Sequence, residues 1–217
     1  MTSSGNGSLK CQQILSSGIF IGALSNLPVG TKDSVYVYSS IISNSYNNNF
    51  YVTYSNYRKH DSDVFLQKYN QNYTPLNPVQ TVHDDLYSSW QTDPLVYNNT
   101  DGNSVILWVD RRNGQYDLYG QIYNSNHNPV GNNIKINDTN SNDWFTIDKC
   151  VESFSDGTFL VAFSGSDTYD GGNIYLQQIN LLGEKVGSNY LVKKNYNGYK
   201  VSIAINKDDE VLLSWYN

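Results

Sequence analysis

Short apolar runs separated by polar residues recur along the whole chain. The runs are about five to eight residues long and rich in Val, Ile, Tyr and Phe, and clusters of Asn, Asp, Gly and Ser stand between them. Runs of this length with such punctuation are typical of β-strands joined by turns. No window of eleven or more residues keeps apolar side chains at a 3.6-residue spacing, so the sequence predicts no helix. The pattern therefore indicates an all-β protein.

Two markers repeat through these runs at nearly equal intervals. A glutamine in a strand-like segment recurs with spacings of 55, 54 and 56 residues, at Gln12, Gln67, Gln121 and Gln177. A large aromatic residue ends a second kind of run with spacings of 54, 55 and 52 residues, at Tyr54, Trp108, Phe163 and Trp215. A fixed period of this length is the sequence signature of a repeat architecture.

Each repeat is predicted to hold four antiparallel strands, named A to D here. In the third repeat they span residues 144–152, 158–163, 173–180 and 190–193, and an Asp156-Gly157 turn joins A to B. An Asp-Gly pair tolerates the positive backbone angles of a tight hairpin. Four such strands in about fifty residues match one propeller blade. We therefore expect a single β-propeller domain over residues 1–217, with repeats of about 53–55 residues.

The two ends of the chain determine how the predicted ring closes. The chain begins with a C strand around Gln12 and a D-like segment at 20–24, and it finishes with A and B strands at 200–205 and 210–216. We expect four blades of four antiparallel strands, closed by pairing the N-terminal C-D strands with the C-terminal A-B strands, because closure removes exposed sheet edges. Two alternatives stay open. In the first, the chain is part of a larger propeller. In the second, the N-terminal and C-terminal strand pairs join between two chains to form a homo-oligomer.

Composition excludes several classes of partner. A net charge of −6 without a basic run argues against nucleic acid, whose binding depends on neutralising phosphates. The apolar stretch at 19–24 is too short to span a bilayer. The polar residues 2–8 lack the basic start and the apolar core of a signal peptide. We therefore expect a cytoplasmic location by default, or an extracellular one if the chain is a trimmed piece of a longer protein. No phosphate-binding glycine loop is present, and His60, His83 and His127 fall in separate loops, so no cofactor or metal is expected.

Aromatic and acidic residues gather in the B–C and D–A loops, which leave a blade on the same face of the ring. Trp90 and Trp144 open consecutive A strands 54 residues apart, each after an acidic residue (Asp85 and Asp143), and Tyr199 holds the related place in the next repeat. A flat ring beside carboxylates and amides suits a sugar, which offers an apolar face and many hydroxyls. The alternative is that these rings wedge adjacent blades.

The segment from Trp108 to Gln121 resembles a repeat of bacterial secreted and surface proteins, Trp-x-Asp-x-Arg-x-Gly-x-x-Asp-Ile-Tyr-x-Gln with a later Gly, here Gly131. The match is good in this repeat and extends to the others only through the strand pattern. The resemblance implies propeller blades with binding or adhesion roles. Within the motif, Asp110 and Arg112 either contact a ligand or pair with each other and Asp117 to brace the B–C hairpin.

An enzyme is the natural rival interpretation. A sialidase needs three clamping arginines, and Arg58, Arg111 and Arg112, two of them adjacent, do not match that family. A glycosidase with paired carboxylates stays open, because the separation it needs is a three-dimensional quantity. We expect a non-enzymatic glycan-binding module without catalytic residues, acting through the Trp90 and Trp144 loops. A protein-docking scaffold is the alternative, and a glycoside hydrolase is the third hypothesis.

Overall fold

The computed structural model describes most of the chain. The described residues are 10–14, 16–26, 37–44, 48–58, 61–86, 89–138, 148–168, 171–196 and 199–216. They form sixteen β-strands and no helix, as the apolar pattern predicted. None of these residues belongs to a helix with the length and apolar character of a membrane span.

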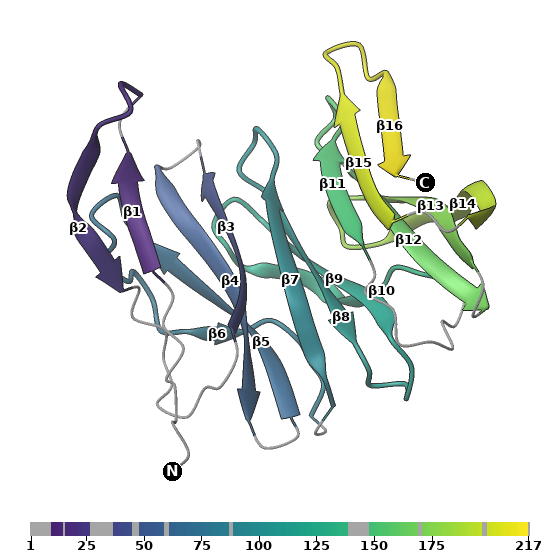
Figure 1. Cartoon of the computed structure of the whole chain (residues 1–217), viewed down its shortest axis with the longest axis horizontal. Coiled ribbons are helices and arrows are strands. Elements are labelled where there is room, and N and C mark those ends of the chain that lie inside the picture. Colours follow the sequence, from purple (N-terminus) through teal and green to yellow (C-terminus); the bar gives the residue numbers. More distant parts are fainter. Residues whose placement is uncertain are drawn as a thin grey trace.

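Three four-stranded antiparallel sheets, called blades 1, 2 and 3 here, make up the centre of the molecule (Figure 1). Blade 1 holds β3 Val37–Asn44, β4 Asn49–Arg58, β5 Asp61–Tyr69 and β6 Gln80–Thr81. Blade 2 holds β7 Gln91–Asn98, β8 Ser104–Asp110, β9 Asp117–Tyr123 and β10 Pro129–Lys135. Blade 3 holds β11 Lys149–Ser153, β12 Phe159–Thr168, β13 Gly171–Ile179 and β14 Lys185–Tyr196. In each blade neighbouring strands are consecutive in sequence, which is the predicted A-to-D order.

Two further strand pairs form separate two-stranded sheets, β1 Lys10–Ile14 with β2 Phe20–Asn26, and β15 Tyr199–Ile205 with β16 Val211–Tyr216. They lie at opposite ends of the row of sheets (Figure 1). The predicted closure, in which these pairs join into a fourth blade within one chain, is therefore not observed. The repeat pattern determines the strands of each blade, whereas closure depends on the angle that accumulates from one blade to the next.

Apolar side chains fill the spaces between successive sheets. Along β8 the residues alternate between two cores: Val105, Leu107 and Val109 pack toward blade 3, whereas Ile106 and Trp108 pack toward blade 1. Every residue of β8 and β9 is buried as a result. A third core joins blade 3 to β15 through Leu160, Ala162, Ile174, Val201 and Ile203. Each fully buried aliphatic side chain contributes about 1.5–3 kcal/mol relative to exposure.

The repeated glutamine has a structural role in all three blades. Its buried side-chain amide donates to the backbone of the next strand or the segment leading to it: Gln67 Nε2 lies 2.6 Å from Asn77 O, Gln121 Nε2 lies 2.9 Å from Val130 O, and Gln177 Nε2 lies 3.3 Å from Val186 O. In blades 2 and 3 the pairing of these strands shifts register at this point, and Gly131 and Gly187 have positive φ of 68° and 71°. The glutamine thus satisfies carbonyl groups near the bulge, and glycine accommodates the backbone there.

Candidate functional site

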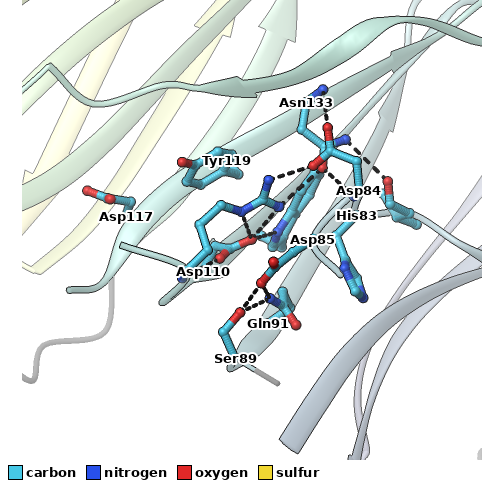
Figure 2. Close-up of polar contacts among 12 residues, drawn as sticks. His83, Asp84, Asp85, Ser89, Gln91, Asp110, Asp117, Tyr119 and Asn133 are labelled. Atoms are coloured by element: carbon cyan, nitrogen blue, oxygen red, sulfur yellow. Dashed lines mark hydrogen bonds and ion pairs between the residues drawn. The ribbon is translucent and has the colours of Figure 1, made fainter. Parts of the chain in front are cut away.

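Arg112 contacts Asp84, Asp110 and Asn133 in a polar network between blades 1 and 2. Figure 2 labels these three partners. The Nη2 of Arg112 is 2.8 Å from Asp110 Oδ2, and its Nη1 is 2.5 Å from Asp84 Oδ1. The indole Nε1 of Trp108 donates to the same Asp110 oxygen at 2.8 Å, and Asp110 is fully buried. Burial alone would lower the pKa of Arg112, but its hydrogen bonds to Asp110 and Asp84 and their negative charges raise it overall.

The carboxylate of Asp110 is held by other groups of the protein. Both carboxylate oxygens of Asp110 accept hydrogen bonds, because Oδ1 accepts from the backbone N–H of Arg112 at 2.8 Å. Asp110 and Arg112 thus pair with each other, which is one of the two arrangements that the sequence left open. Asp117 pairs elsewhere, with Lys135 Nζ at 2.9 Å and Asn137 Nδ2 at 2.8 Å.

One part of the network recurs one repeat later. Asn133 of β10 donates to Gln121 Oε1 at 2.7 Å and accepts from the backbone N–H of Asp84 at 2.8 Å. In blade 3, Asn189 donates to Gln177 Oε1 at 2.6 Å and accepts from the backbone N–H of Asp138 at 2.6 Å. We call these two sets the Gln-Asn-Asp clamps. Each clamp connects a blade to the segment that leaves the preceding blade. Asp84 and Asp138 therefore have equivalent structural roles in the two clamps.

Trp90 and Asp85 lie at the entry to β7. The Asp85 carboxylate accepts hydrogen bonds from the Ser89 hydroxyl and from Gln91 Nε2, the latter at 3.1 Å. Trp90 is 37% exposed, and its backbone oxygen accepts from the N–H of Arg111 at 2.9 Å. The partly exposed Trp90 ring thus lies directly before β7, the first strand of blade 2, as the sequence predicted.

Of the other predicted ligand-binding residues Asp143, Trp144 and Tyr199, only Tyr199 is among those that the structure describes. Asp143 and Trp144 lie outside the described residues. Tyr199 begins β15, one strand pair beyond blade 3. Within the described part of the chain, no three His, Cys, Asp or Glu side chains are grouped to hold a metal ion.

Two carboxylates that the sequence analysis did not single out lie near the starts of β7 and β11. Asp93 of β7 accepts from Lys149 Nζ at 2.7 Å, and the Lys149 side chain is only 4% exposed whereas that of Asp93 is 50% exposed. Asp148 lies directly before β11, and its Oδ2 accepts a hydrogen bond from the backbone N–H of Lys200. The Nζ of Lys200 lies 3.6 Å from Asp148 Oδ1. Burial lowers the pKa of Lys149, against the raising effect of Asp93 and Asp148.

The backbone around this group is unusual. Asp93 and Lys200 have positive φ of 53° and 66°, which is uncommon for any residue other than glycine and less common for Lys than for Asp. Both stand where the pairing of their strand shifts register, between Thr92 and Leu95 in β7 and between Tyr199 and Val201 in β15. Bulges re-aim side chains and are frequent beside active sites. Asp93 and Asp148 are 55 residues apart, one repeat period, and that spacing was the only sequence signal that could have paired them.

No family model matches this sequence, and none of the curated proteins matches it. Solved structures do. An endo-arabinase from Bacteroides thetaiotaomicron VPI-5482 has 13% identity and a TM-score of 0.51, over 91% of this chain and 76% of the arabinase. An exo-β-1,3-galactanase from Phanerochaete chrysosporium has 12% identity and a TM-score of 0.49, over 96% of this chain and 53% of the galactanase.

The first of these structures corrects one expectation. The sequence predicted a non-enzymatic glycan-binding module, and that prediction is overturned by the likeness to a structure named as an endo-arabinase. At 13% identity the likeness itself shows the fold, and the chain is an all-β protein of β-propeller-like architecture.

Proposed function

We propose that this chain is a glycoside hydrolase whose site for cleaving a polysaccharide lies where β7 and β11 begin. The observation that carries the proposal is the placement of two carboxylates, Asp93 and Asp148, near the buried ammonium of Lys149, with a β-bulge at Asp93. The fold likeness to an endo-arabinase supports it, because that protein is named for cleaving a polysaccharide of arabinose.

Hydrolysis of a glycosidic bond needs two carboxyl groups with different roles. One protonates the leaving oxygen, and the other activates water or attacks the sugar. Asp93 forms an ion pair with Lys149, and half of the Asp93 side chain is open to solvent, so we assign Asp93 the base or nucleophile role. The lysine that faces Asp148 is 81% exposed, so water screens this ion pair, and we assign Asp148 the acid role that remains. Trp90, three residues before Asp93, offers a stacking surface for a sugar ring.

The test is release of reducing sugar from a panel that includes arabinan and β-1,3-galactan. We expect turnover by the native chain, and a loss of at least about 100-fold in kcat for Asp93→Asn and for Asp148→Asn, since a positioned acid or base contributes about 10²–10⁴-fold. Asp208→Asn is the matched control, because Asp208 pairs with its exposed neighbour Lys207 in a surface turn, and it should keep full activity.

Folding must be separated from chemistry, because Asp93→Asn leaves the buried Lys149 without its counter-charge. The double variant Asp93→Asn with Lys149→Met removes both charges and should fold with a cooperative thermal transition while staying inactive. No sugar release from any member of the panel, or full activity in both single variants, would show the proposal to be wrong.

A further inference from the structure

The strand β16 ends the row of sheets with an unpaired edge. In each blade the second strand pairs with a neighbour on both sides, whereas β16 pairs with β15 and, among the described residues, with no other strand. Its side chains are largely exposed, with Leu212 at 73% and Tyr216 at 70%. An unpaired edge with exposed apolar side chains is a template for another strand.

The strand β1 offers the matching edge at the other end of the row. It corresponds to the third strand of a blade, since it carries Gln12 and pairs with β2 as β5, β9 and β13 pair with the strands that follow them. In a complete blade the third strand also pairs with the second, and β1 has no such neighbour among the described residues. The two ends thus present the two halves of one blade.

The register of the complete blades determines how these edges would meet. The repeated glutamine stands opposite the residue two positions before the marker aromatic in every blade, in the pairs Val52–Gln67, Ile106–Gln121 and Val161–Gln177. The same rule places Gln12 opposite Leu213, two positions before Trp215. It also places Cys11 opposite Ser214, and Ile14 opposite Val211, two apolar residues that are exposed in the single chain.

We propose that β16 of one copy of this chain pairs with β1 of a second copy, so that the two end sheets combine into a composite four-stranded blade. The second copy is favoured over the same chain because β1 and β16 lie at opposite ends of the row (Figure 1). The contact is head-to-tail, because the surface on one copy differs from the surface on the other, and it builds rings or longer assemblies. It does not depend on the proposed hydrolytic activity.

A single substitution tests the register. Ser214→Cys creates a cysteine opposite the native Cys11 of the second copy, and opposite residues in antiparallel strands have Cα atoms about 4.5–5.5 Å apart, which suits a disulfide. Under mild oxidation we expect a ladder of at least two-fold higher mass on a non-reducing gel, which collapses on reduction. In a mixture of ¹⁴N- and ¹⁵N-labelled chains, the disulfide-linked peptide that joins Cys11 to the substituted position in β16 should carry mixed labels.

Three controls define the result. Ser214→Cys with Cys11→Ser should give no ladder, since the native Cys150 is partly buried and burial raises the pKa of its thiol to about 11, which makes it a poor nucleophile. Leu212→Cys lies two residues out of register, and Asp208→Cys lies in the turn before β16, so both should crosslink at least about ten-fold less. Light scattering of the native protein should give a mass above the 24.5 kDa of one chain.

Three outcomes would overturn the proposal. A disulfide-linked peptide of the Ser214→Cys variant without mixed labels means that the halves meet within one chain. Equal crosslinking by Asp208→Cys means random collision. No crosslink from a folded Ser214→Cys variant means that something other than β1 covers the edge. Sugar release by the same preparations tests the hydrolase separately, because β16 is remote in sequence from Asp93 and Asp148.

Discussion

His127 illustrates how burial determines the chemistry of a single residue. Its imidazole stacks on Tyr51 of blade 1 with ring centroids 3.6 Å apart, and among the described residues neither ring nitrogen has a hydrogen-bond partner. Burial, with a smaller effect of the Lys68 charge, lowers the pKa of His127 to about 3. This histidine is therefore a neutral packing residue rather than a metal ligand or an acid-base group.

The lowered pKa predicts a loss of stability in mild acid. The unfolded chain binds a proton at His127 below about pH 6.5 while the folded chain does not, so stability falls as the pH drops from 6.5 toward 3. The loss attributable to His127 between pH 7 and pH 5 is about 2 kcal/mol. Urea unfolding at the two pH values measures it.

The control for this effect is His127→Asn, because asparagine tolerates the positive φ of 61° at this position. The variant is expected to be less stable at both pH values but to lose about 2 kcal/mol less between them. Equal losses in the two proteins would mean that His127 is protonated in the folded chain.

At the scale of the strands, close contact between blades depends on a few glycines. Gly183, in the turn between β13 and β14, has φ of +78°, and a Cβ atom there would lie 2.9 Å from the carbonyl oxygen of Val130 in blade 2. Gly187 has a similar φ of +71° but open space around its Cβ position. The two positions therefore separate backbone strain from contact between blades.

We predict that Gly187→Ala costs about 1–2 kcal/mol from left-handed strain alone. Gly183→Ala should cost more, by a further 1–3 kcal/mol or so, because blades 2 and 3 must move apart. Chemical denaturation of both variants gives the comparison. Equal losses would indicate that the turn moves away without disturbing the neighbouring blade.

At the scale of the whole molecule, stability should fall from the middle of the row toward its ends. Blade 2 is packed on both faces, whereas β16 has an exposed edge and exposed side chains. Amide hydrogen exchange in dilute, monomeric protein should be at least about 100-fold slower in β8 and β9 than in β16, because the end sheet opens without unfolding the centre. Uniform protection along the chain would instead indicate a single cooperative unit with covered ends.

Crosslinked Ser214→Cys protein offers the complementary measurement. If β1 of a second copy covers β16, exchange in β16 should slow in the crosslinked form, while β8 and β9 stay unchanged. Unchanged exchange in β16 would place the disulfide outside a regular strand pair.

The strands, their order in each blade and the repeat could be predicted from the sequence, because the apolar runs, the turn residues and the recurring glutamine are local features that return in every repeat. The sequence also named Asp110 and Arg112 as a pair, since only two positions separate them. Tertiary structure alone decided the remainder. Whether the row closes depends on angles between blades. Asp93 meets Lys149, and with it the neighbouring Asp148, because blade 2 packs against blade 3 and a bulge in β7 stands at Asp93.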